Sequence, residues 1–181
     1  MAGIDFLQKK IGGYLLKEQL LKKEEYTQME KPFLRKARKN FTIANLMFKI
    51  SEQDKFKKAL ALSQNFETYE WVIVVSYYSM YVSALAALAK QGFKSKSHAA
   101  TIVVLEHYYV HQQKNLKEKH IQQLTKAYTL SEELINKLIQ TKTKRETAQY
   151  DATSSISREN AVSALKDAEE FITKIEETLV Q

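Results

Sequence analysis

The feature that most constrains the fold is an uncharged segment from Trp71 to Ala89, bounded by Glu70 and Lys90. A helix that is apolar all round either spans a bilayer or lies buried at the centre of a protein. Serines and tyrosines lie within this segment, whereas the tyrosines of membrane helices gather at the two interfaces. We therefore expect a buried central helix in a soluble protein with no membrane contact, extending from about residue 66 to Lys90.

Small side chains follow one stripe of this expected helix. The residues concerned are Ser76, Ser79, Ser83 and Ala86 or Ala87. Spacings of three and four residues place side chains on the same helical face. The stripe predicts that a neighbouring helix packs closely against this face, while larger side chains fill the other sides.

Turn-forming residues are scarce along the rest of the chain. Pro32 is the single proline, and only Gly92 follows Gly13 among the four glycines. Because hairpins and sheet turns rely on these residues, the composition predicts an all-α protein. The absence of cysteine excludes disulfides and thiolate metal sites. The first apolar run is interrupted by Lys9 and Lys10, unlike a signal peptide, so we expect a cytoplasmic protein.

Hydrophobic periodicity and capping residues predict the remaining helices. One is expected within residues 4–26, a second over 32–50, and a connection with one helical turn over 51–65. One later helix is expected to begin at Ser97, and a polar stretch at 112–123 that forms a loop or an exposed turn follows it. Two more helices are expected to begin at Ser131 and Ser157. The expected core residues of the last helix are Ala161, Leu165, Ala168, Ile172, Ile175 and Leu179.

The charge balance favours an anionic partner without identifying one. The chain has 28 basic and 21 acidic residues, giving a net charge of +7. Positive proteins attract nucleic acid, nucleotides and anionic surfaces. On the helix over 32–50, Lys31, Arg35, Arg38 and Lys39 share the outer arc. This stripe either contacts phosphates or is the solvated face that any bundle helix needs.

Other chemical groups are few. His107 and His111 are four residues apart, but the string HYYVH lacks the Glu of a zinc protease motif, so we expect aromatic packing and no metal site. No glycine-rich phosphate loop is present, and we expect no cofactor. The tyrosines could stack nucleic-acid bases or pack in the core. They are Tyr77, Tyr78, Tyr81, Tyr108 and Tyr109.

Two segments of the sequence resemble the HEPN domain family. Residues 76–100 read SYYSMYVSALAALAKQGFKSKSHAA, and residues 145–175 read RETAQYDATSSISRENAVSALKDAEEFITKI. A third, KPFLRKARKNFTIANLMF at residues 31–48, matches the first helix of the family. The resemblance covers about residues 31–181 and leaves 1–30 as an N-terminal helical extension. It implies an antiparallel bundle of about five helices, which usually forms a homodimer.

The HEPN family includes metal-independent ribonucleases, toxin partners of small nucleotidyltransferases, and members proposed to bind nucleotides or RNA. Its nucleases carry an arginine followed, after four to six residues, by a histidine. None of the four arginines in this chain has such a histidine, and the segment after Arg145 instead offers Tyr150 and Asp151. Because the ordinary pKa of tyrosine is about 10, Tyr150 is a poor proton shuttle at neutral pH. We therefore expect a non-catalytic module.

The candidate ligand-binding residues lie around that segment: Arg145, Tyr150, Asp151, Lys142 and Lys144. Arg145 either holds a phosphate or pairs with a carboxylate across the bundle. Three functions stay open. The first is a non-catalytic module that binds RNA or nucleotide, or that pairs with a small nucleotidyltransferase in a toxin–antitoxin-like system. The second is a HEPN ribonuclease, and the third is a structural bundle without nucleic-acid binding.

Overall fold

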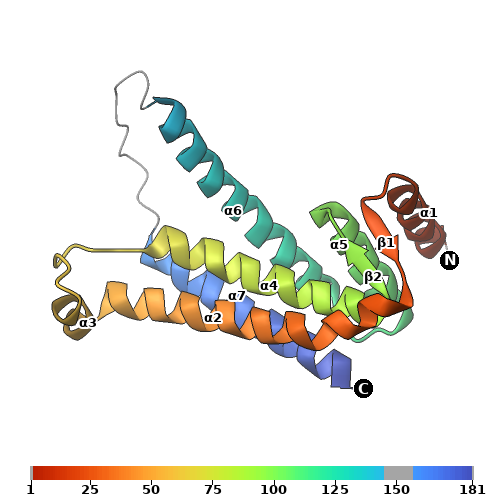
Figure 1. The fold of residues 1–181 in the computed structure, drawn as a ribbon, viewed down its shortest axis with the longest axis horizontal. Coiled ribbons are helices and arrows are strands. Elements are labelled where there is room, and N and C mark those ends of the chain that lie inside the picture. Colours follow the sequence, from red (N-terminus) through yellow and green to blue (C-terminus); the bar gives the residue numbers. More distant parts are fainter. Residues whose placement is uncertain (1, 145–156, 181) are drawn as a thin grey trace.

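The computed structural model describes residues 2–144 and 157–180 (Figure 1). Its helices are α1 (Ala2–Leu16), α2 (Glu30–Glu52), α3 (Asp54–Ala59), α4 (Tyr69–Lys90), α5 (His98–Leu105), α6 (Glu118–Lys144) and α7 (Arg158–Val180). A 3₁₀ segment (Glu24–Met29) precedes α2, and a π-helical segment (Glu106–Gln112) extends α5. Two short strands, β1 (Leu20–Lys22) and β2 (Phe93–Ser95), complete the fold. The predicted all-α class is confirmed, with this small sheet as an addition.

The four long helices alternate in direction along the chain. The end of α2 meets the start of α4, where the Ser51 hydroxyl lies 2.9 Å from that of Thr68. The α6 helix packs antiparallel on α4, so that Leu134 joins Ile73 in a buried cluster. The α7 helix then runs beside α4 and ends where the Lys90 ammonium donates to the Leu179 carbonyl at 2.8 Å.

The α4 helix occupies the centre of this bundle (Figure 1). By length and hydropathy alone it could cross a membrane, but 78% of its most apolar window is buried within the protein. The predicted stripe of small residues is also buried. The Ser79 and Ser83 hydroxyls donate to the carbonyls of Ser76 and Met80 at 2.6 and 2.7 Å. Because these bonds satisfy both hydroxyls within α4 itself, burying them against neighbouring helices costs little free energy.

Several predicted helix ends are confirmed. The Ser97 hydroxyl accepts from the Ala100 amide at the start of α5, and Ser157 accepts from the Asn160 amide at 3.3 Å before α7. The α4 helix ends at Lys90 as predicted, and Gly92 follows with a φ of 73°, where a Cβ would lie 3.1 Å from the Lys23 carbonyl oxygen. All six predicted core residues of α7 are buried.

The predicted helix start at Ser131 is wrong. The α6 helix begins at Glu118, within the stretch expected to be a loop or an exposed turn, and continues through Ser131 without interruption. Leu124, Ser131 and Leu134 are all buried, so Ser131 is the small member of one apolar stripe. A serine followed by acidic residues favours a helix start locally, but packing against α4 decided the outcome here.

The N-terminal segment packs into the core, and it does not form the single long helix that was expected. The expected helix over 4–26 stops at Leu16, and β1 then pairs antiparallel with β2, with Leu21 opposite Lys94. Leu7, Ile11 and Leu20 are buried in the same cluster as Leu88. Through its pairing with β2, β1 therefore fixes the N-terminal segment next to the C-terminal end of α4.

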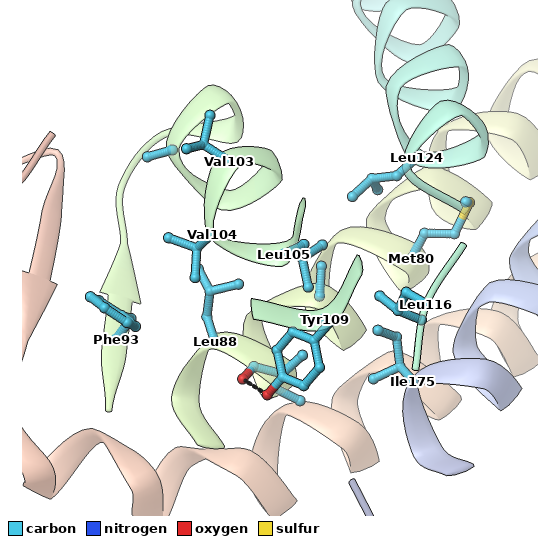
Figure 2. Packing of buried hydrophobic residues seen from close by; sticks show 14 of the residues in the cluster. Met80, Leu88, Phe93, Val103, Val104, Leu105, Tyr109, Leu116, Leu124 and Ile175 are labelled. Atoms are coloured by element: carbon cyan, nitrogen blue, oxygen red, sulfur yellow. Dashed lines mark hydrogen bonds between the residues drawn. The ribbon is translucent and has the colours of Figure 1, made fainter. Parts of the chain in front are cut away.

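Figure 2 shows the core around the C-terminal half of α4. Leu88, Val104, Leu105 and Tyr109 pack together there, and the Tyr109 hydroxyl donates to the Ala87 carbonyl at 2.7 Å. Burial raises the pKa of Tyr109 to about 12, so this hydroxyl keeps its proton and remains a donor.

We predict that Leu20→Ala lowers the free energy of unfolding by about 2–5 kcal/mol, because Leu20 is fully buried and the truncation leaves a cavity. Leu60→Ala is the matched control: Leu60 is 55% exposed, and its loss should cost no more than about 0.5 kcal/mol. Urea denaturation followed by circular dichroism measures both. Equal stabilities for the two variants would show that β1 does not share the core.

Candidate functional site

The residues predicted to bind a ligand lie at or beyond the edge of the described chain. Lys142 and Lys144 belong to the last turn of α6, where the backbone is described but the side chains are not. Arg145, Tyr150 and Asp151 lie outside the described residues. In sequence these three stand between the end of α6 and the start of α7, so the contacts of all five candidates stay a prediction.

The predicted basic stripe of α2 divides into two parts. Arg38 donates from Nε to the Glu176 carboxylate of α7 at 2.7 Å and also donates from its terminal nitrogen to the same group. The hydrogen bond to Glu176 raises the pKa of Arg38. Lys31, Arg35 and Lys39 are exposed, and none of them forms an ion pair with a described residue. Arg38 is therefore structural, whereas the other three remain available to a partner.

One face of α4 is not covered by the bundle, contrary to the expectation that the whole helix is buried. Trp71 is 48% exposed and Tyr78 is 43% exposed, with half-buried Val75 between them on the same side. We call these three residues the open face. The sequence did hold a signal for it, since Trp71 and Tyr78 are seven residues apart and lie outside the small-residue stripe.

The open face lies beside α2. Met47 of α2 and Val75 of α4 pack against the same buried cluster, which contains Val72. Ile43 lies four residues before Met47 and Lys36 lies seven residues before Ile43, so both share the helical side of Met47, and both are exposed. The exposed aromatic side chains of α4 and an exposed lysine of α2 therefore belong to adjacent helices.

The tyrosines separate into different environments. Tyr109 lies in the core of Figure 2, and Tyr108 packs on Phe93 with ring centroids 5.6 Å apart. Tyr77 and Tyr81 instead gather with residues that the sequence placed far away along the chain. These are His98, the first residue of α5, and Tyr128 of α6. Pattern reasoning missed this cluster because no local spacing connects three helices.

His98 is enclosed by the rings of this aromatic–histidine cluster (Tyr77, Tyr81, His98 and Tyr128). Its ring centroid lies 4.2 Å from that of Tyr81 and 4.5 Å from that of Tyr128, which is stacked at 22°. The Tyr77 hydroxyl forms a hydrogen bond with His98 Nδ1. One stacked ring and one ring tilted at 40° therefore contact the imidazole, and the Tyr77 phenol forms a hydrogen bond with it.

The protonation states in the cluster follow from burial. Burial raises the pKa of Tyr77 far above its usual range and lowers the pKa of His98. At neutral pH the phenol is therefore the donor and the imidazole the acceptor. A hydrogen bond to Glu132 raises the pKa of Tyr128. All the tyrosines in the cluster are neutral, and Glu132 contributes the nearby negative charge.

A small cavity of about 40 Å³ lies between α4, α6 and α7. The polar residues that line it are Ser76, Lys126, Asn160, Ser163 and Asp167, and Tyr77 lines it as well. The Ser76 hydroxyl is buried and has no hydrogen-bond partner among the described residues. The cavity is the size of a few water molecules or one small polar group, well below the volume of a nucleotide site.

The two histidines at 107 and 111 do not form a metal centre. His107 is buried and its Nε2 lies 3.0 Å from the Gln112 amide nitrogen, while His111 lies 3.7 Å from the Glu106 carboxylate. Within residues 2–144 and 157–180, no group of three or more histidine or acidic residues could hold a metal ion.

Comparison with known proteins identifies the family. A family model described as the HEPN domain matches residues 31–178. A search of the curated proteins finds no match. The matched segment begins at α2, ends within α7 and includes the open face and the aromatic–histidine cluster. Since the match covers most of the chain and agrees with its helical fold, this protein belongs to the HEPN domain family.

Proposed function

We propose that this chain is a non-catalytic, cytoplasmic HEPN module that binds single-stranded RNA along the open face of α4 and the basic side of α2. The observation that carries the proposal is the exposure of Trp71 and Tyr78 on α4, next to a helix, α2, whose exposed cations form no ion pair within the described chain. Proteins that bind single strands without sequence preference combine aromatic stacking platforms with a positively charged track.

The aromatic residues supply the stacking part of this surface. Trp71 and Tyr78 are seven residues apart, which corresponds to about 10 Å along a helix axis. Each ring can therefore stack on a different base of one strand. Both side chains carry a polar tip and an apolar body, which suits a surface that is exposed in the free protein and covered in a complex.

The basic residues supply the electrostatic part. Lys31, Arg35 and Lys39 follow one another at intervals of four residues, about 6 Å along the helix axis. Together with Lys36 they form a row of exposed cations along α2. Such a row can neutralise successive phosphates, and the release of counterions gives affinity that depends steeply on salt.

The arginines support the non-catalytic assignment. Arg38 is bound to Glu176, and Arg158 donates to the Glu52 carboxylate at 2.6 Å. Arg35 is exposed, but it has no histidine four to six residues later in the sequence. The described arginines therefore lack the sequence pairing through which HEPN nucleases place a proton-exchanging histidine near a charge-stabilising cation.

We predict that the protein binds fluorescently labelled single-stranded RNA and that two kinds of variant weaken the complex differently. Trp71→Ala should cost about 1–3 kcal/mol, because one stacked base is lost. Arg35→Gln/Lys39→Gln should reduce the slope of log affinity against log salt by about 0.7 for each cation removed. Anisotropy titrations at several salt concentrations measure both effects.

The matched control is Lys55→Gln/Lys58→Gln on α3, which removes the same charge from two exposed lysines at another place. If both double variants lose affinity equally, the net charge alone attracts RNA and the surface is not specific. If the parent shows no salt-dependent binding, the structural-bundle alternative is favoured. Retained RNA binding by Trp71→Ala with an altered oligomeric state would mark the open face as a protein interface.

We predict that the purified parent shows no metal-independent cleavage of RNA. A ribonuclease assay in the presence of a chelator, run beside Arg145→Ala, tests this. Cleavage by the parent that disappears in the variant would favour the ribonuclease alternative. Cleavage that survives in both would indicate a contaminant, since the substitution removes the arginine in the segment that resembles the family's motif.

Self-association and a nucleotidyltransferase partner complete the proposal. HEPN domains usually form homodimers, and two-fold contacts are the commonest among oligomers. Exposed Leu46 of α2, 50% accessible, offers an apolar contact outside the open face. We predict a dimer in sedimentation velocity at micromolar concentration, and its dissociation by Leu46→Arg. A monomeric parent would contradict the dimer. Copurification with a nucleotidyltransferase would separately support the toxin–antitoxin-like role.

A further inference from the structure

We propose that His98 is a proton-driven switch that hydrogen-bonds to Tyr77 when neutral and pairs with Glu132 when protonated. The switch sets the environment of the Tyr77 ring, which also lines the cavity between α4, α6 and α7. The inference rests on the geometry of the aromatic–histidine cluster and does not depend on RNA binding.

The neutral state is the one that the structure shows. Tyr77 is 3% exposed, and its hydroxyl meets His98 Nδ1. A neutral imidazole has one nitrogen lone pair, which here accepts the phenol proton. Because burial lowers the pKa of His98 below its ordinary value of 6.5, this state prevails at neutral pH.

Protonation removes the acceptor on which this bond depends. Both nitrogens of an imidazolium carry a proton, so His98 can no longer accept from the Tyr77 hydroxyl. Two donors then face one another, and the Tyr77 hydroxyl, on a side chain that is only 3% exposed, loses its acceptor, which costs free energy. The bond between Tyr77 and His98 is therefore available only to the neutral form.

Glu132 is the partner available to the charged form. The described rings in contact with His98 are Tyr77 and Tyr81 of α4 and Tyr128 of α6. Glu132 lies one helical turn after Tyr128, and the rest of α5 has no titratable side chain. The tyrosines are neutral in the pH range of histidine titration. Glu132 acts to raise the pKa of His98, and its carboxylate is exposed on α6.

The stacking rings accommodate both charge states. The Tyr128 ring stacks on His98 and the Tyr81 ring contacts it at a tilt of 40°, with centroids 4.5 and 4.2 Å from that of the imidazole. The electron-rich face of tyrosine attracts cations as well as neutral rings. Protonation therefore does not require His98 to leave the cluster, and it decides only which polar group the imidazole contacts.

The exchange links pH to the interior of the bundle through Tyr77. Its hydroxyl belongs to the cluster and its ring to the cavity that contains the unpartnered Ser76 hydroxyl. When His98 is protonated, the buried Tyr77 hydroxyl loses its acceptor and must donate to a different group. Because the pKa of His98 is lower in the folded chain than in the unfolded chain, its contribution to stability is present above pH 6.5 and is lost as the pH falls below that value.

The test is an NMR titration of the histidine ring carbons in the full chain between about pH 5 and 8, the range in which histidine titrates. His98→Gln identifies the His98 resonance. Tyr77→Phe removes the donor that favours neutral His98 and should raise its titration midpoint by about 0.5 pH units. Glu132→Gln removes the charge that favours protonated His98 and should lower the midpoint by a similar amount, about 0.5 pH units.

The control is His107, which lies beside Gln112 and outside the cluster, so its midpoint should not change in either variant. In the parent, the ring resonances of Tyr77 should shift with the same midpoint as His98. Opposite shifts in the two variants, with Tyr77 following His98, support the switch. An unchanged or lowered midpoint in Tyr77→Phe, an unchanged or raised one in Glu132→Gln, or a Tyr77 signal independent of His98 would overturn it.

Discussion

The rest of the structure depends on covering α4, a helix with no charged side chain between Glu70 and Lys90. Because exposing the apolar surface of α4 to water is unfavourable, α2, α6 and α7 each pack an apolar side against it. Serine and alanine on one stripe let these neighbours approach closely. The short β1–β2 sheet and the start of α5 close its C-terminal end.

The exceptions to this burial are the functionally informative places. Trp71 and Tyr78 leave the open face on α4, and the adjacent α2 carries exposed cations. The aromatic–histidine cluster lies where α5 and α6 meet α4, and it contains the partly exposed His98. Large aromatic side chains at the edge of a core keep a polar group within reach of solvent, which suits both recognition and proton exchange.

Local signals predicted helix ends well where the chain changes direction. Gly92 takes a positive φ that side chains disfavour, and Ser97 and Ser157 cap free amides that the next helix leaves unpaired. The same reasoning failed at Ser131, because a cap residue inside a continuous apolar stripe packs against α4 instead of starting a helix. Tertiary burial outweighs a capping preference worth about 1 kcal/mol.

The sequence by itself determined the helical class, the HEPN family and the lack of an arginine–histidine nuclease motif, because each depends on residue type and spacing along one segment. Only the tertiary structure decided that Arg38 pairs with Glu176 while Arg35 stays exposed, since both residues lie on the same predicted stripe. It also brought His98 between Tyr81 and Tyr128. Such contacts join residues from separate helices, and helix packing, not local periodicity, fixes which of them meet.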